Sequence, residues 1–287
     1  MTSDELSPEI GALLASLTEQ APSNDAAAVF AAALAARAAQ PLQSPPIDTE
    51  VSAFARAIDD VHRTVEQLRT SDWKRRCVNG LNVGQLVGHL IGTQLSMAAE
   101  LGLQATAATS TDHVESTRQA IADGAATTPI EAASQFARVS AVLIDHLSQL
   151  DSAGLAAPSR FGTIEGDIRF ILMFRVFELW THDNDLRAAV GLARVEPDAD
   201  RLWMMTRTVM PLVGRMGGDR LRIVLTGPGG GVWPASGDEV ATIAVDATAF
   251  CRRAANRMTI DDLQADITGD AAAARQTLGA LAELALD

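Results

Sequence analysis

Four polar residues recur at helical spacing within residues 175–187, which read RVFELWTHDNDLR. At 3.6 residues per turn, Arg175, Glu178, His182 and Asp185 fall within an arc of roughly 80° on one face of a predicted helix. Burying a carboxylate and an imidazole without partners costs free energy, and a divalent metal would be a partner for both. Glu178 and His182 are therefore candidate metal ligands, although a glutamate and a histidine at this spacing are also common on solvated helix faces.

A metal site usually needs a third protein ligand from another part of the chain. His89 lies in the apolar segment LVGHLIG, where flanking glycines would allow helices to approach closely. His113 lies in a polar segment, and His62 and His146 stand beside charged or polar residues on predicted helix surfaces. Context alone favours His89 as the third ligand, although a histidine on an apolar helix is more often a hydrogen-bonded core residue.

Two histidines and one glutamate would leave at least one coordination position of the metal open. Open positions are typical of catalytic rather than structural metal sites. Arg175 and Asp185 share the helix face with Glu178 and His182, so we expect them to orient these two ligands.

The composition limits the classes of function. The 287 residues are 47% hydrophobic and carry a net charge of −13 without a stripe of Lys and Arg, which argues against nucleic acid and anionic membranes as partners. No apolar run reaches the ~20 residues of a membrane span. The N-terminus lacks the basic region of a secretory signal. Two distant cysteines, Cys77 and Cys251, predict no disulfide framework and favour a cytoplasmic location, and the lack of tyrosine excludes a phenol as catalytic acid.

The first three-quarters of the chain predict helices. Residues 1–47 are an N-terminal extension with a short predicted helix at 26–39. The spacing of apolar residues and the capping signals predict further helices. They are expected at 48–68 with Asp48 as N-cap, 83–101 with Asn82 as N-cap, near 113–123, at 129–150, at 165–190 ending at Gly191, and at 198–216. Residues 151–163 are expected to form a loop, and the pair Asn79-Gly80 a turn.

The pattern changes after Gly217-Gly218. Alternation of polar and apolar residues predicts short strands, followed or separated by helices. The strands are expected at 220–226, 232–233, 242–245 and 265–268, and the helices at 247–256 and from 270 onward. The glycine-rich run at 227–231 lacks a GK[ST] sequence and fits a hairpin turn better than a phosphate loop. We therefore expect an α+β fold that is mostly helical, with a helical domain at 48–217 and a small α+β domain at 218–287.

Three segments of the chain together resemble one family. LNVGQLVGHLIG and FRVFELWTHDNDLRAAVG resemble the metal-ligand helices of the mycothiol-dependent maleylpyruvate isomerase-like proteins, a part of the DinB-like superfamily. VDATAFCRRAANRMTIDDLQADITGD resembles the small C-terminal domain of that family, which is similar to sterol carrier proteins. The resemblance covers residues 48–287 and implies an up-and-down four-helix bundle with a metal at one end, followed by the α+β domain.

The resemblance also implies a chemistry. It places the metal ligands at His89, Glu178 and His182, and it implies zinc as the metal and mycothiol as a thiol cosubstrate. A metal-bound thiolate would attack a small electrophile, as an isomerase or as an S-transferase. The family uses an arginine of its C-terminal domain near the substrate, for which Arg222 is our choice, with Arg252 and Arg257 as alternatives. The partners would be a thiol and a small molecule, and the chain a monomer or a homodimer.

Two alternative functions stay open at this point. The chain could be a DinB-like metal enzyme recruited to a thiol-independent reaction in small-molecule biosynthesis. It could also be a non-catalytic protein that binds a small molecule or has a regulatory role, but such a protein has no need for all three ligands. We also expect Cys77 and Cys251 to be dispensable.

Overall fold

The computed structural model describes residues 49–103, 113–162 and 164–284, and no side chains of residues 113–116. The chain divides into two compact units, residues 1–44 and 45–287, and the fold below is that of the second unit. The predicted extension and its helix at 26–39 lie outside the described residues. No helix among the described residues is long and apolar enough to cross a membrane.

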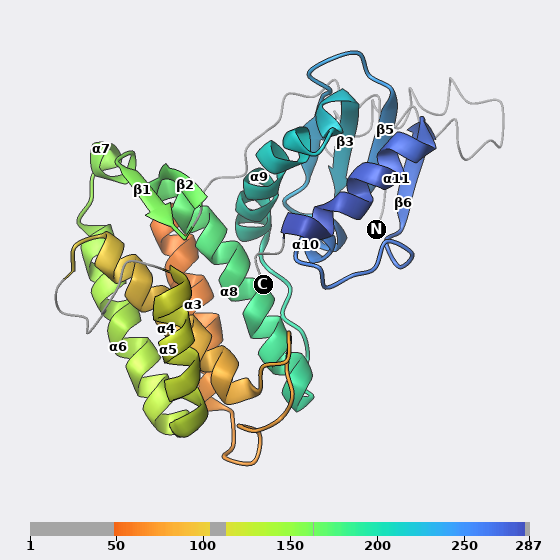
Figure 1. Ribbon diagram of the computed structural model, residues 1–287. Coiled ribbons are helices and arrows are strands. Elements are labelled where there is room, and N and C mark those ends of the chain that lie inside the picture. The colour runs from red at the N-terminus through yellow and green to blue at the C-terminus, as the bar shows by residue number, and fades with distance from the viewer. Residues whose placement is uncertain (1–48, 104–112, 163, 285–287) are drawn as a thin grey trace, which may run out of the picture. The chain divides into compact units, whose positions relative to one another are not determined.

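The helical part of the second unit is a bundle (Figure 1). Its long helices lie against one another, α3 against α6 and α8, and α4 against α5, α6 and α8. They are α3 (Glu50–Glu66), α4 (Val83–Glu100), α5 (His113–Ala126), α6 (Pro129–Ser148) and α8 (Ile168–Val190). Together with the sheets described below, they confirm the predicted α+β, mostly helical fold.

The helices begin where side chains take up the free N–H groups of the first turn. Asn82 caps α4 and forms a reciprocal capping box with Gln85, as predicted. The N-cap of α3 is Thr49 and not the predicted Asp48, because the Thr49 hydroxyl accepts a hydrogen bond from the N–H of Ser52. The helix α8 ends at Gly191, which is in the left-handed conformation as predicted.

The helices α4 and α5 pack closely because both have glycine at the contact. A Cβ atom on Gly88 would lie 2.2 Å from the carbonyl oxygen of Ala120, and one on Gly124 would lie 2.4 Å from that of Gly84. The indole N–H of Trp73 donates to the Gly124 oxygen at 2.9 Å on the same side. The glycine beside His89 therefore allows the close approach that the sequence indicated.

The segment before α8 differs from the prediction. Residues 151–163 were expected to be a loop, but they contain the short helix α7 (Ser152–Leu155) and the strand β1 (Pro158–Phe161). Strand β1 pairs antiparallel with β2 (Ile164–Asp167), so α8 begins at Ile168 rather than near residue 165. Asp167 sets this start, since its carboxylate accepts from the N–H of Phe170 at 2.8 Å.

The C-terminal part contains a four-stranded mixed sheet. The strand order is β4-β3-β5-β6, with β3 parallel to β5 and the other pairs antiparallel. The elements follow the predicted order. They are α9 (Ala199–Arg215), η2 (Gly218–Arg220), β3 (Leu221–Thr226), β4 (Gly231–Trp233), β5 (Ala241–Asp246), α10 (Ala247–Ala254), β6 (Ala265–Gly269), α11 (Ala271–Ala280) and η3 (Leu281–Leu284).

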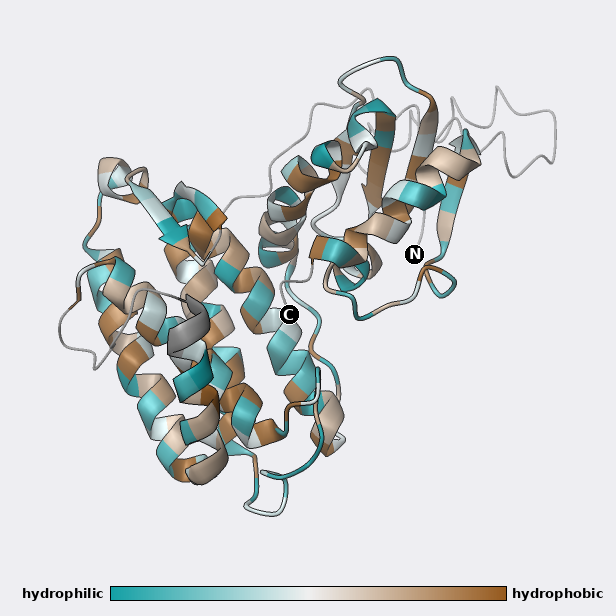
Figure 2. Ribbon diagram, in the orientation of Figure 1, coloured by the Kyte–Doolittle hydropathy of each residue, from teal (hydrophilic) through white to brown (hydrophobic). Residues whose placement is uncertain are grey.

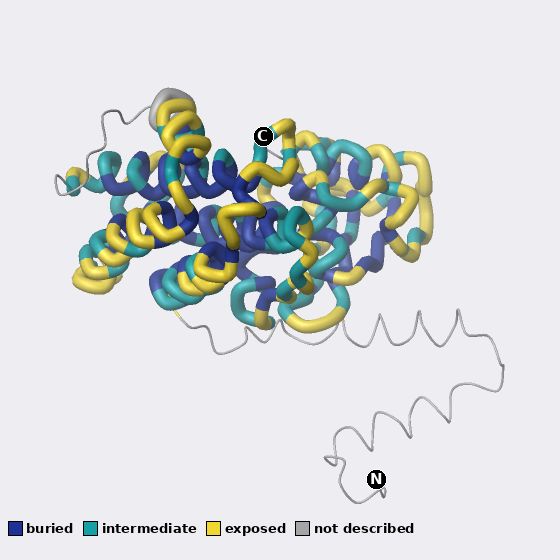
Figure 3. Tube along the Cα trace, turned by 90° about the horizontal axis from the view of Figure 1, so that it is seen from below, coloured by how far each residue is buried: buried dark blue, intermediate teal, exposed yellow. Residues whose placement is uncertain are grey.

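Apolar side chains of the sheet and bundle form the core. On β3 and β5 apolar residues are buried, and both strands are largely brown in Figure 2. In Figure 3 the buried stretches lie in the interior and the exposed ones on outer faces. The helix α9 contacts both α8 and α10. The glycine run at 227–231 forms the predicted turn, with positive φ at Gly227 and Gly229. The proposed boundary between two domains at residue 217 stays a prediction.

Candidate metal site

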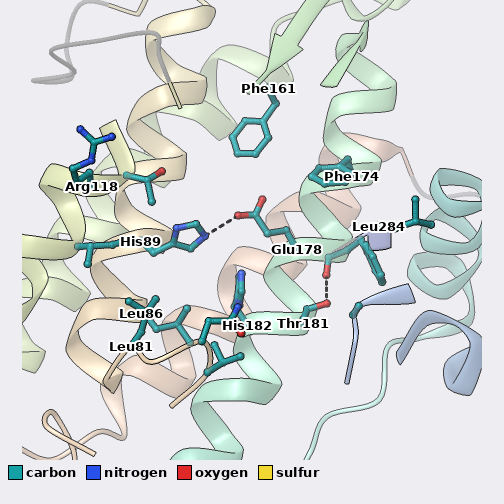
Figure 4. Close-up of a pocket in the computed structure, with 16 residues that line it drawn as sticks. Leu81, Leu86, His89, Arg118, Phe161, Phe174, Glu178, Thr181, His182 and Leu284 are labelled. Carbon is teal, nitrogen blue, oxygen red and sulfur yellow. Dashed lines mark hydrogen bonds and ion pairs between the residues drawn. The ribbon is translucent and has the colours of Figure 1, made fainter. Parts of the chain in front are cut away.

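His89 of α4 meets Glu178 and His182 of α8 inside the bundle (Figure 4). One ligand atom from each residue lies within 4.8 Å of the other two. The Nε2 atom of His89 is 3.3 Å from Oε1 of Glu178, and the two imidazole ring centres are 5.2 Å apart at an interplanar angle of 83°. The structure therefore brings together the three residues that the sequence selected.

The donor set fits a divalent metal. Two ligands of one tetrahedral zinc ion lie about 3.3 Å apart, given Zn–N and Zn–O bonds of about 2.0–2.1 Å. The separation of His89 from Glu178 matches this value. All three side chains are at most 17% exposed, so they form a partly enclosed cluster rather than a solvated surface group. Among the described residues, no other group of His, Cys, Asp and Glu meets the same test.

Arg175 holds Glu178 from the side away from His89. Its guanidinium makes an ion pair with Oε2 of Glu178, which leaves Oε1 toward His89. Arg175 is fully buried and also donates to Thr93 Oγ1 at 2.8 Å and to Gln94 Oε1 at 3.2 Å, both on α4. The ring of Phe161 lies 4.7 Å from its Cζ atom. Arg175 therefore fixes the carboxylate and ties α8 to α4.

The electrostatics keep Glu178 charged and His89 neutral. Burial by itself would raise the pKa of Glu178, but the charge of Arg175 and the hydrogen bond from His89 outweigh it, and the pKa lies well below its usual range. Burial lowers the pKa of His89, and the hydrogen bond to Glu178 opposes this only in part. A carboxylate and a neutral imidazole are the forms that bind a metal.

His182 is oriented through its other ring nitrogen. Its Nδ1 atom is 3.0 Å from Oδ2 of Asp185. Arg257, which follows α10, donates from Nε to Oδ1 of Asp185 at 2.8 Å and from Nη2 to Oδ2 at 2.9 Å. Burial would raise the pKa of Asp185, but the hydrogen bonds from His182 and Arg257 outweigh it and keep the carboxyl ionised. The Nε2 atom of His182 is then left for a metal.

The three residues lie in the wall of a cavity of about 410 Å³, drawn in Figure 4. Most of the other lining residues are apolar. The lining comprises Val78, Asn79, Leu81, Leu86, His89, Thr117, Arg118, Ile121, Phe161, Phe174, Phe177, Glu178, Thr181, His182, Ala255 and Leu284. A cavity of this size and polarity is typical of sites for small organic ligands.

The three candidate arginines of the C-terminal part differ in their position and in their partners. Arg222 lies on β3 and does not line the cavity, so the structure does not bring our chosen arginine to the site. Arg252 pairs with Glu196, and only Arg257 reaches the metal-ligand cluster, through Asp185. Sequence patterns gave no signal for this contact, because Arg257 and Asp185 are 72 residues apart.

The remaining predicted residues lie elsewhere. Neither cysteine lines the cavity: Cys77 donates to the carbonyl oxygen of Asp185, and Cys251 is a buried residue of α10. His62 pairs with Glu66 on α3, and His146 lies in the last turn of α6. The structure adds Phe161 to the site, which the sequence missed because its hairpin was read as a loop.

Comparison with known proteins relates part of this chain to a known family. The family described as mycothiol maleylpyruvate isomerase N-terminal domain matches residues 54–187. No curated protein sequence matches the chain.

Two solved structures share the fold. The crystal structure of a mycothiol-dependent maleylpyruvate isomerase superposes with a TM-score of 0.55 at 16% identity, and that of its histidine-to-alanine variant with 0.57 at 15%. In each case the match covers 76% of this chain and 91% of the other. The match to this family spans all three candidate ligands, and the resemblance inferred from the sequence is confirmed.

Proposed function

We propose that this protein is a metal-dependent enzyme in which His89, Glu178 and His182 hold a zinc ion, and mycothiol is the cosubstrate for a reaction on a small electrophile. The observation that carries the proposal is the convergence of these three ligand atoms within 4.8 Å at a largely apolar cavity. The domain match and the two mycothiol-dependent structural relatives support the choice of thiol.

The side chains present a defined set of donor atoms. Arg175 takes Oε2 of Glu178, and Asp185 takes Nδ1 of His182. The atoms left are His89 Nε2, Glu178 Oε1 and His182 Nε2, which leaves a coordination position for the thiol sulfur. A zinc ion bound there would lower the pKa of the thiol and stabilise its thiolate at neutral pH.

The nucleophile would come from the cosubstrate and not from the chain. Among the described residues that line the cavity there is no cysteine, serine or lysine. Of the two threonines that line the cavity, Thr181 donates its hydroxyl to the carbonyl oxygen of Phe177 at 2.9 Å, and Thr117 has no hydrogen-bond partner for its hydroxyl among the described residues. We infer that the chain positions the thiol and shields it with the apolar wall, which includes Phe161 and Phe174.

The thiolate would form a carbon–sulfur bond with an electrophilic carbon. In an isomerisation of a cis-dienoate, rotation about the former double bond is followed by loss of the thiol. In an S-transfer, the thioether is the product. Both use the same ligands and the same open position, so the electrophile decides between them.

The thiol dependence is tested with purified full-length protein loaded with zinc. Conversion of maleylpyruvate and of a general thiol-alkylating electrophile is followed with mycothiol, glutathione, cysteine or no thiol. We expect turnover with mycothiol only, and its loss in Glu178→Gln but not in Glu66→Gln, a surface control. Turnover without any thiol would contradict the proposal and favour the thiol-independent alternative.

A further inference from the structure

A second, smaller cavity shares Thr181 in its wall with the cavity described above. Its volume is about 110 Å³. The residues that line it come from α8, from the segment between α8 and α9, and from α10 and the turn after it. They are Trp180, Thr181, Asn184, Asp185, Ala188, Arg194, Arg252 and Arg257.

The lining is strongly positive in a chain whose net charge is −13. Three arginines, Arg194, Arg252 and Arg257, line it together with a single acidic residue, Asp185. The side chains of Arg252 and Arg257 are only 20% and 19% exposed, so water screens their charges poorly. Holding like charges together in a partly buried space is unfavourable unless an anion joins them.

The pairs within the protein take up only part of this charge. Asp185 accepts from Arg257, and Glu196, itself 57% exposed, pairs with Arg252. Arg194 makes no ion pair among the described residues, and Glu196 does not line the cavity. A positive charge is therefore left over beside the cavity.

The backbone holds these arginines in place. Val195, next to Arg194, donates its N–H to Asn184 Oδ1 at 2.9 Å and accepts at its carbonyl from Trp180 and Asn184. After α10, Asn256 adopts a positive φ of 54°, and the N–H of Arg257 donates to the Arg252 oxygen at 2.8 Å. The backbone segments that carry these arginines are thus anchored, and the side chain of Arg194 is exposed at the edge of the cavity.

We propose that this cavity binds a small oxyanion, a phosphate or a carboxylate, between Arg194 and Arg252 with Arg257 at its rim. The planar guanidinium fork matches both anions, and the volume suits a group of that size rather than a whole metabolite. The oxyanion would be either free in solution or a group of a larger ligand whose remainder lies outside the cavity. None of the three candidate metal ligands lines this cavity. Asp185 and its partner Arg257 do line it, and Asp185 also contacts His182.

The test uses isothermal titration of the full-length protein with inorganic phosphate and with succinate, at constant ionic strength set by sodium chloride. Each titration is repeated after removal of metal by a chelator. We expect saturable binding of at least one anion that persists without metal. The anion that binds more tightly identifies the class of oxyanion, phosphate or carboxylate, that the cavity takes.

Variants of the arginines test whether the anion binds in this cavity. Arg194→Gln and Arg252→Gln should each weaken it by about tenfold, since each removes a charged hydrogen-bond donor, and Arg194→Lys should restore part of the affinity. Arg207→Gln is the control, because it removes the same charge from α9, where Arg207 lies over Trp203 away from the cavity. Absence of saturable binding, its loss with the metal, or equal weakening in Arg207→Gln would overturn the proposal.

Discussion

Arg257 contacts both carboxylate oxygens of Asp185, at 2.8 and 2.9 Å, and so connects the segment after α10 to the helix that carries two of the candidate ligands. Asp185 in turn lies 3.0 Å from Nδ1 of His182. Since the planar fork of Arg257 is filled by Asp185, this arginine acts on the site through His182.

Replacing Arg257 by Gln should weaken metal binding. Asp185 would lose its two-point contact and His182 its fixed orientation, and such losses typically cost 10–100-fold in metal affinity. Competition with a chromophoric chelator measures the affinity. Arg220→Gln, an exposed arginine that contacts the Asp238 carbonyl, is the matched control and should leave it unchanged. Equal affinities in the two variants would show that Asp185 needs no support from Arg257.

Replacing Arg175 by Met should destabilise the metal-free protein by about 3–5 kcal/mol, because the buried carboxylate of Glu178 loses its counter-charge. Urea unfolding in the presence of a chelator measures this loss. Arg169→Met is the control on the same helix, because its partly exposed pair with Glu50 should contribute at most about 1 kcal/mol. A loss in Arg175→Met no larger than in the control would contradict the buried pairing.

Adding a methyl group at Gly88 should disturb the helix that carries His89. The new Cβ would lie 2.2 Å from the Ala120 oxygen, so α4 and α5 must separate, at a cost of about 1–3 kcal/mol and with weaker metal binding. Gly214→Ala on α9 is the control. Nothing lies within 4 Å of its new Cβ, so it should stabilise the helix slightly. Thermal unfolding of both variants shows whether a loss of stability comes from the packing at Gly88 or from any glycine-to-alanine change in a helix.

Cys77 should react slowly with iodoacetamide in the folded protein. Burial, and then the charge of Asp185, raise the pKa of its thiol to about 11, so on the order of 0.1% is thiolate at pH 8. The labelling rate should increase with pH up to about pH 11, whereas the unfolded chain should label fast from about pH 8.5. The labelling is done in a Cys251→Ser variant, in which Cys77 is the only cysteine of the sequence. Fast labelling at pH 8 would mean that Cys77 is more exposed and more acidic than its surroundings indicate.

The sequence predicted which three residues lie together better than it predicted what surrounds them. Glu178 and His182 are one turn apart on one helix, so a local period was enough to pair them. His89 was selected by its apolar, glycine-flanked context, and the close packing at Gly88 shows why that context matters. The order of strands and helices after residue 217 also followed from local patterns.

Other features depend on contacts that no local pattern encodes. The hairpin of β1 and β2 has strands of only four residues each, too short for alternation to distinguish them from a loop. For that reason the sequence missed Phe161. The partner of Arg257 and the position of Arg222 depend on tertiary packing, and the choice of Thr49 over Asp48 as N-cap shows that helix ends vary by a residue.

The central claim is that His89, Glu178 and His182 hold a metal ion. The most direct test is elemental mass spectrometry of the untagged protein beside His89→Ala, His182→Ala and the control His62→Ala, a residue on the partly exposed face of α3. We expect about one zinc ion per chain in the wild type and in the control, as a single three-ligand site would hold, and none in the other two variants. Unchanged metal content in His182→Ala, or no metal in the wild type after reloading, would contradict the assignment.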